Sequence, residues 1–211
     1  MRFVITAGPT REYLDDVRFI SNASSGRMGY AIARAAVAAG HTVDLVTGPV
    51  HLKPPPGVRL ISIVSTRDMY QAVRDCFARA DCLIGAAAPA DYRPVHRRRG
   101  KAKKNVGKTV LELKPTIDIL ATLGKRKGRR ILIAFALEVQ NPLAHAFEKM
   151  RRKQADAIVL NDPSAFGTTR SNATLLLPTG EQMDLTHATK RRIGKALVSL
   201  AERLYAERSV R

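Results

Sequence analysis

The sequence predicts an α/β protein with a Rossmann-like, doubly wound, mainly parallel sheet and flanking helices. Two observations support this fold class. Short apolar runs typical of buried strands alternate with longer segments of helical character, and several of these segments end at glycine. Strands that alternate with helices pair in parallel through right-handed crossovers. The length of 211 residues suits one domain, which we expect to span residues 1–211.

The first half of the chain contains four predicted strands and two predicted helices. Residues 2–7 are a short apolar run ending at Gly8-Pro9, which is typical of a buried strand. Residues 27–39 are rich in alanine and are followed by Gly40, which favours a helix that ends there. The alternation continues with strands at 41–49, 58–65 and 81–88 and a helix at 67–80.

The second half repeats this pattern. Strands are predicted at 129–138 and 156–162, on either side of a helix at 142–153. The last helix is predicted at 188–207. A helix there brings four aliphatic side chains to one face, those of Ile193, Leu197, Leu200 and Leu204. Ligands of such sheets bind beyond the carboxyl ends of the strands. The candidate loops are therefore residues 8–26, 88–108, 138–142 and 161–172.

The net charge of +18 raises the question of a nucleic-acid partner. The basic residues are spread over several segments, the chain has no tryptophan, and only 5% of its residues are aromatic. Such a composition is poor material for stacking bases. We therefore expect no specific nucleic-acid partner, and favour a basic surface on an enzyme whose ligands are polyanions.

The N-terminal segment and the cysteines indicate the compartment. The first apolar run is too short for a signal peptide or a membrane span. Cys76 and Cys82 have no metal-binding spacing and are expected to be buried, reduced thiols. We expect a cytoplasmic protein with no membrane partner and no metal site built from protein ligands.

Two familiar phosphate-binding motifs are absent. A dinucleotide fingerprint needs G-x-G-x-x-G directly after the first strand, but Gly8 is followed by Pro9 and Thr10. A Walker A loop needs a glycine where Ala102 stands before Gly107-Lys108-Thr109. Neither motif explains how this chain would bind a phosphate.

The long loop after the first strand offers another anion site. Ser24 or Ser25 is predicted to cap the helix that follows, and Gly26 and Gly29 allow close approach of the backbone to a ligand or to the sheet. The start of a helix presents free N–H groups and the positive end of the dipole. A serine-capped helix without a ligand explains these local features equally well.

Small residues follow the fourth strand, from Gly85 to Pro94. They would let a flat ring or a sugar lie against the backbone, and Asp91 could accept hydrogen bonds from ribose hydroxyls or orient a metal ion. Tight packing of helix on sheet is the alternative explanation.

A basic loop at about 93–108 is predicted to be mobile, because it has no apolar period and two glycines. Its lysines could close over a triphosphate, although a solvated surface loop explains its composition better. Lys149 and Lys153 lie four residues apart on one helical face, where a phosphate would relieve their repulsion. Taken alone, however, exposed lysines are the simpler interpretation of this pair, and Phe135 would be a core residue.

In their order along the chain, the motifs resemble phosphopantothenoylcysteine synthetase, the synthetase domain of the bacterial DNA/pantothenate metabolism flavoprotein family. The resemblance runs from about residue 2 to 200. It is carried by residues 6–12, 17–22, 24–26, 28–30, 86–88, 90–94, 101–104, 118–120 and 161–162. The segment Arg18-Phe19-Ile20-Ser21-Asn22, followed by Ser24-Ser25-Gly26, is the most specific part.

The resemblance implies a ligase of coenzyme A biosynthesis. In its reaction 4′-phosphopantothenate attacks CTP to give an acyl nucleotide and pyrophosphate, and L-cysteine then displaces CMP. It also implies Mg²⁺ with the triphosphate, a homodimer, and no flavin. The main alternative is a Rossmann-like nucleotide- or flavin-binding oxidoreductase, against which the missing dinucleotide fingerprint counts.

Residue roles follow from matching positions. The resemblance implies that Asn22 holds the acyl nucleotide for attack by cysteine, and that Lys101 stabilises the activation step. Substrate contacts are implied for Arg18, Asn22 and Ala88. Nucleotide contacts are implied for Ser24, Gly85, Ala86, Ala87, Asp91, Lys101, Ile117, Asp118, Ile119, Leu120, Phe135, Lys149 and Lys153.

The chain departs from the family pattern beside several of these positions. Asp16 and Ile117 stand where proline is usual, Pro89 replaces valine, and Ala102 replaces isoleucine in the Lys-x-Lys-Lys motif that begins at Lys101. These changes leave the choice between CTP and ATP open.

Overall fold

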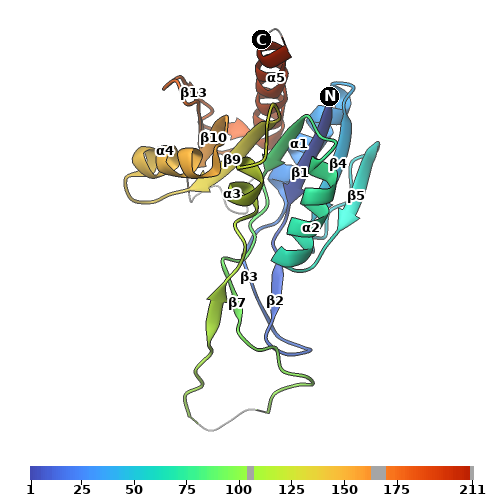
Figure 1. Ribbon diagram of the computed structural model, residues 1–211, viewed down its shortest axis with the longest axis vertical. Helices are drawn as coiled ribbons and strands as arrows, with labels where there is room; N and C mark the ends of the chain where they lie inside the picture. The colour runs from blue at the N-terminus through green and yellow to red at the C-terminus, as the bar shows by residue number, and fades with distance from the viewer. Residues whose placement is uncertain (104–106, 163–169, 210–211) are drawn as a thin grey trace.

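The computed structural model describes residues 1–103, 107–162 and 170–209, and its centre is an eight-stranded sheet (Figure 1). The strand order is β13-β12-β10-β9-β6-β1-β4-β5. All six predicted strands are present and pair in parallel, which confirms the predicted fold class. They are β1 (Arg2–Ala7), β4 (Thr42–Thr47), β5 (Val58–Ser62), β6 (Cys82–Gly85), β9 (Ile131–Leu137) and β10 (Ala157–Asn161).

Two antiparallel strands extend one edge of this sheet. These strands, β12 (Ala173–Leu176) and β13 (Gln182–Asp184), pair in antiparallel register beyond β10. The sequence analysis did not predict them. A further short antiparallel pair, β11 (Arg170–Ser171) with β14 (Ala188–Thr189), precedes the last helix.

Helices cover both faces of the sheet, and alternate residues of each strand face opposite layers. On β1, Ile5 packs with α1 (Arg27–Ala38) and α5 (Lys190–Ser209), whereas Val4 packs on the other side. That second layer contains α2 (Thr66–Phe77), α3 (Ile119–Gly124) and α4 (Pro142–Lys153). Of these helices only α3 was not predicted. The predicted apolar face of α5 is confirmed, since Ile193, Leu197 and Leu200 are buried and Leu204 packs against them.

The predicted serine cap of α1 is wrong. The N-cap is Gly26, whose φ of 75° is left-handed, and a glycine has no side chain with which to accept a helix N–H. Ser24 Oγ instead accepts from Gly26 N at 3.3 Å. Ser65, predicted to end a strand, caps α2 in a capping box with Asp68.

Gly29 allows α1 to lie directly on β1. A Cβ at this position would stand 2.6 Å from Ala7 Cβ and 2.7 Å from the carbonyl oxygen of Thr6. The expected close approach of Gly29 to the sheet is therefore confirmed. It brings the start of α1 to the carboxyl end of β1.

Two hairpins form an arm that projects away from the sheet (Figure 1). They are β2 (Arg11–Tyr13) with β3 (Phe19–Ser21), and β7 (Tyr92–Pro94) with β8 (Leu113–Pro115). The predicted basic loop connects β7 to β8, and its described parts, 95–103 and 107–112, contain no helix or strand. Lys104 of the lysine motif lies outside the described residues, so the full motif is not placed. The sequence analysis had predicted loops here and missed the hairpins.

The topology places a switch point between β1 and β6. The chain proceeds from β1 to β4 and β5 on one side, and then returns to place β6 on the other side of β1. At such a switch point the loops diverge beyond the carboxyl ends of the strands. Here the two loops are tied together, because Ala88 N donates to Gly8 O at 2.9 Å and Ala87 N to Thr6 Oγ1 at 3.1 Å.

Candidate functional site

Two adjoining cavities lie at the carboxyl ends of the central strands. Ala87 and Phe135 line both of them. The first cavity has a volume of about 200 Å³ and the second about 230 Å³. Phe135 comes from β9 and is only half-buried. The interpretation of Phe135 as a plain core residue is therefore wrong: its ring is part of the boundary between two cavities.

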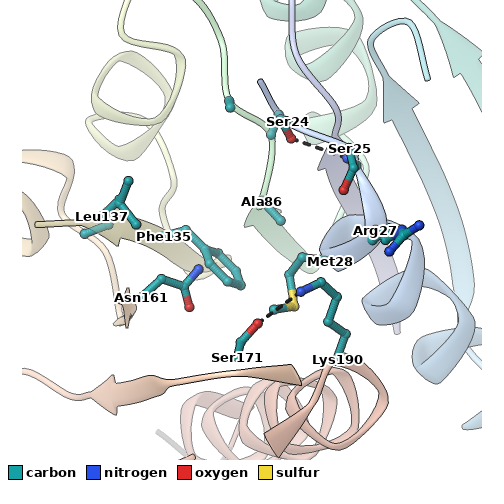
Figure 2. A pocket seen from close by; sticks show the side chains of 14 residues that line it. Ser24, Ser25, Arg27, Met28, Ala86, Phe135, Leu137, Asn161, Ser171 and Lys190 are labelled. Atoms are coloured by element: carbon teal, nitrogen blue, oxygen red, sulfur yellow. Dashed lines mark hydrogen bonds between the residues drawn. The ribbon is translucent and has the colours of Figure 1, made fainter. Parts of the chain in front are cut away.

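The first cavity opens at the start of α1 (Figure 2). Ser24, Ser25, Gly26, Arg27 and Met28 line it together with Ala86 to Ala88. The opposite wall comes from distant parts of the chain, namely Phe135 to Leu137, Asn161, Ser171 and Lys190. The N–H groups and positive dipole end of α1 therefore face a cavity, as the sequence analysis expected of an anion site.

Lys190 gives this cavity an excess of positive charge. Its Nζ donates to Ser171 Oγ at 3.0 Å. Burial, and then the nearby Arg27 guanidinium, lower the pKa of Lys190 below its ordinary value. Within the described ranges 1–103, 107–162 and 170–209, no carboxylate lies within 4.0 Å of the Lys190 ammonium. An anionic group would be favoured in such a cavity.

The second cavity has a different electrostatic character. Lys153 Nζ donates to both carboxylate oxygens of Asp118 at 2.7 Å, and Arg152 lies 3.4 Å from the same carboxylate. Burial opposes ionisation of Asp118, but the Lys153 ammonium and the Ala121 N–H outweigh it and hold the pKa of Asp118 below its usual range. Lys149 pairs with Glu138. Two carboxylates therefore compensate the two lysines.

This pairing changes the interpretation of Lys149 and Lys153. From the sequence, exposed lysines were the simpler interpretation and a phosphate that relieves their repulsion was the alternative, while the family resemblance implied nucleotide contacts. Both do line the second cavity, but each has its own acidic partner, Glu138 for Lys149 and Asp118 for Lys153. Because each lysine is already paired, their mutual repulsion requires no phosphate here.

Gly85 and the alanines after it both pack tightly and line the cavities. A Cβ at Gly85 would stand 2.4 Å from Leu120 Cδ1, so this glycine lets Leu120 cover the end of β6. Ala86 to Ala88 line the first cavity, and Gly85, Ala87 and Asp91 line the second. Tight packing, one alternative from the sequence, is confirmed at Gly85, and the alanines that follow line the cavities; contact with a ligand stays a prediction.

Most of the residues expected to contact the nucleotide line one or both of the two adjoining cavities. Those that line the second cavity are Gly85, Ala87, Asp91, Ile117, Asp118, Ile119, Leu120, Phe135, Lys149 and Lys153. Ser24 and Ala86 line the first cavity, as does Ala88. Asp118 also has a local role that the sequence analysis missed, because its side chain caps α3 by accepting from Ala121 N at 3.0 Å.

Three expected site residues lie on or next to the arm. Asn22 follows β3, and its Nδ2 donates to the carbonyl oxygens of Ala88 at 3.2 Å and Pro89 at 2.9 Å. Asn22 therefore touches the alanine segment, although it lines neither cavity, and its expected role stays a prediction. Arg18 and Lys101 also line neither cavity.

Sequence reasoning missed several residues of the first cavity. Arg27 and Met28 lie directly after the expected anion loop, which was the available signal. No local motif marks Ser171 or Lys190, since only the packing of α5 against α1 brings them to the cavity. Asn161 belongs to a quoted motif, although no role was inferred for it.

The described residues offer neither a metal-binding cluster nor a membrane-spanning helix. No cluster of three or more His, Cys, Asp or Glu side chains suited to a metal ion occurs among residues 1–103, 107–162 and 170–209. Over the same part of the chain, the helices include none with the length and apolar character needed to cross a membrane.

The fold defines a doubly wound α/β protein, and the two adjoining cavities place its candidate ligand site at the switch point of the sheet. Residues 1–204 match the family described as "DNA/pantothenate metabolism flavoprotein C-terminal domain". The chain belongs to this family, which confirms the family resemblance found in the sequence.

Individual relatives agree with this assignment. The chain is 43% identical, over 192 residues, to the coenzyme A biosynthesis bifunctional protein CoaBC of Bacillus subtilis, covering 89% of this chain and 47% of that protein. The crystal structure of the C-terminal domain of a protein of the same name is 40% identical, with a TM-score of 0.86 and coverage of 98% and 96%. The chain spans about half the length of the curated relatives it matches.

A more distant structure shares the fold. It is a mutant of Cab2 in complex with phosphopantothenate-cysteine, 16% identical, with a TM-score of 0.81 and coverage of 98% of this chain and 88% of that chain.

Proposed function

We propose that this chain is a phosphopantothenate–cysteine ligase that uses CTP. Family membership and the C-terminal domain of CoaBC support the reaction class. The Cab2 complex contains phosphopantothenate-cysteine, which is the product of this reaction. The observation that carries the proposal most directly is the pair of adjoining cavities at the switch point, one with an excess of positive charge and one with compensated charges.

In this proposal the first cavity binds phosphate. The positive dipole end of α1, the Arg27 side chain and the Lys190 ammonium all suit a polyanion. To bind a phosphate oxygen, the Lys190 ammonium would weaken or break its hydrogen bond to Ser171 Oγ.

The second cavity then holds the nucleoside. Asp91 lies at its edge, where a carboxylate would accept hydrogen bonds from ribose hydroxyls, and Ile117 to Leu120 supply backbone and apolar surface for a ring. Lys149 and Lys153, already paired with carboxylates, would position the nucleotide rather than neutralise three phosphates.

The reaction has two steps. A carboxylate oxygen of 4′-phosphopantothenate attacks the α-phosphorus of CTP, and the bond to pyrophosphate breaks. The cysteine amine then attacks the acyl carbon, CMP leaves with the bonding electrons, and the nitrogen loses a proton as the amide forms. Lys101 would stabilise charge in the first step, and Arg18 and Ala88 would contact the acid.

Asn22 would act in the second step. Its Nδ2 already donates to Ala88 and Pro89, so it lies beside the proposed acyl group. To hold the acyl oxygen it would exchange one of these bonds without a change in charge.

Mg²⁺ fits this site as a partner of the triphosphate. Among the described residues there is no three-ligand cluster for it, and Mg²⁺ characteristically uses one or two carboxylates together with phosphate oxygens and water. Asp91 would supply such a carboxylate as the alternative to accepting hydrogen bonds from ribose hydroxyls. When bound, the ion would neutralise charge on the phosphate oxygens.

We also propose that the chain acts as one domain, forms a homodimer through its arm, and works in the cytoplasm. Val17, Tyr92, Val110 and Leu111 are exposed on or beside the arm hairpins, and Val110 is 88% exposed. Covering such side chains with a second copy would bury apolar surface. Sedimentation of wild type and Val110→Lys tests the dimer.

The proposed cytoplasmic location agrees with the cysteines, because these free, buried thiols need no oxidising compartment.

The test of the function is pyrophosphate release. It is expected from CTP only when 4′-phosphopantothenate is present, before cysteine is added, and more slowly with ATP. The Asn22→Ala variant should accumulate the acyl nucleotide, detected by mass spectrometry, with little product. Release of pyrophosphate without the acid would overturn the proposal, whereas a coloured protein with NAD(P)H-dependent activity would favour the oxidoreductase alternative.

A further inference from the structure

The residues on both sides of Lys101 are bonded to the turn between β2 and β3. Gly100 N donates to Asp16 Oδ2 at 2.6 Å, and Asp16 N donates back to Gly100 O at 3.3 Å. On the other side, Ala102 N donates to Asp15 Oδ2 at 3.1 Å. Two adjacent aspartates therefore hold the backbone immediately before and after Lys101.

Arg18 completes these contacts. Its Nη2 donates to Asp15 Oδ2 at 2.6 Å and to the carbonyl oxygen of Ala102 at 2.8 Å, and its Nε donates to Asp15 at 3.0 Å. Asp15 also accepts from the backbone N–H groups of Val17 and Arg18, and its side chain is only 2% exposed. A buried carboxylate that accepts several hydrogen bonds is a rigid anchor.

A further contact holds the same loop closer to β7. Arg97 Nη2 donates to Asp16 Oδ1 at 2.9 Å, and the Arg97 guanidinium stacks 5.1 Å from the centre of the Tyr13 ring. Arg98 N donates to Leu14 O at 2.9 Å. Contacts across a sequence separation of more than 80 residues thus determine the path of the loop.

We propose that Asp15 and Asp16 are positioning residues that fix the Lys101 loop against Arg18, so that both cations are presented together to the substrates. We name Asp15, Asp16, Arg18, Gly100 and Ala102 the aspartate clamp. The inference rests on the proposed function for the role of Lys101. It explains why Arg18 and Lys101, which line neither cavity, nevertheless lie in one unit of structure.

In this proposal the aspartate clamp orients Lys101 toward the substrates. A lysine side chain has four rotatable bonds, and on a free loop it samples many positions. Ordering the loop and the side chain costs conformational entropy at each turnover. Hydrogen bonds to the backbone on both sides of Lys101 remove the backbone part of that cost in advance, because the loop is already ordered where the side chain begins. Asp16 acts on Lys101 only through the loop backbone, because its carboxylate accepts from Gly100 N and Arg97; it is therefore a positioning residue, not a catalytic one.

The first experiment measures amide hydrogen exchange in the whole protein without substrates. Asp16→Ala should speed exchange at Gly100, and Asp15→Asn at Ala102, while the melting temperature of Asp16→Ala stays near wild type. Asp75→Ala is the matched control, since Asp75 is an exposed carboxylate paired with an arginine on α2. Unchanged exchange at both amides would overturn the clamp.

The second experiment is a double-mutant cycle on single-turnover pyrophosphate release. Asp16→Ala should slow this step by roughly ten- to a hundredfold, with little change in the KM for CTP, because a small misplacement of a reacting group costs that much. In a Lys101→Ala background the same change should have almost no effect. Equal slowing in both backgrounds would show that Asp16 does not act through Lys101.

The two proposals can fail separately. If Lys101→Ala keeps full activity, the role of Lys101 in the proposed function is wrong, while the exchange data still decide whether the clamp holds the loop. Asp16→Asn should recover part of the rate, because an amide oxygen still accepts from Gly100 N. Failure of that recovery alongside unchanged exchange would assign the effect to charge and overturn positioning.

Discussion

Lys153 on α4 donates from its Nζ to both carboxylate oxygens of Asp118, each at 2.7 Å, while the same carboxylate caps α3. One side chain thus joins the start of one helix to the end of another and forms a wall of the second cavity. Since capping and ion pairing use the same group, substitutions at Asp118 can separate the two.

Asp118→Ala is expected to lower the free energy of unfolding by about 1 kcal/mol or more, because α3 loses its cap. Asp118→Asn should keep most of the cap, since asparagine is an equally good N-cap residue. Both variants should raise the KM for CTP, because Lys153 loses its partner. Urea unfolding and initial rates check this, and equal destabilisation by the two variants would point to the ion pair instead.

Lys190→Ala is expected to weaken CTP binding by roughly ten- to a hundredfold, the range for one charge-assisted hydrogen bond. CMP binding should change little if Lys190 contacts the β- and γ-phosphates. Calorimetric titration of both nucleotides measures the difference, with Lys195→Ala as control because Lys195 is exposed on the same helix. A loss confined to the KM for 4′-phosphopantothenate would instead assign the cavity to the phosphate of the acid.

Gly29→Ala tests the contact of α1 with β1. Helix propensity alone would make alanine stabilising by about 1 kcal/mol at this position. The new Cβ, however, would stand 2.7 Å from the backbone oxygen of Thr6, so we expect destabilisation by roughly 1–3 kcal/mol. Arg34→Ala, at an exposed position of α1, should leave stability nearly unchanged. Stabilisation by Gly29→Ala in urea unfolding would contradict the close approach.

The aspartate clamp should loosen in acid. Hydrogen bonds from Arg18, then from backbone N–H groups, hold the pKa of Asp15 far below its ordinary value of 3.8. The Gly100 N–H, and then Arg97, lower the pKa of Asp16. Because both folded-state pKa values are depressed, the clamp's stabilising effect is complete above the ordinary value and is lost as the pH falls through the folded values.

Amide proton shifts of Gly100 and Ala102 in NMR spectra report this titration directly. We expect Gly100 to shift at a higher pH than Ala102, since the pKa of Asp15 is the more strongly lowered. Asp16→Asn should abolish the Gly100 transition and leave that of Ala102. Simultaneous shifts of the two amides, together with global unfolding, would refute separate titration.

Prediction from sequence worked best where the pattern is periodic and continuous. Buried parallel strands such as β1 and β9 are short apolar runs, and α5 shows its apolar face through the spacing of Ile193, Leu197 and Leu200. The arm hairpins were missed because β2 and β3 have three residues each, too few for a period to show. The serine cap failed because a left-handed glycine occupies the N-cap position.

Local sequence patterns predicted the six parallel strands, the helices α1, α2, α4 and α5, and the motifs that mark the family, because each depends on residues close together in the chain. Which charged groups meet follows only from the fold. Asp118 and Glu138 compensate the lysines of α4, Lys190 faces the start of α1, and Asp15 and Asp16 hold the Lys101 loop. The physical reason is that Coulomb interactions and hydrogen bonds depend on distance in space, and all of these partners except Glu138 lie more than 30 residues apart.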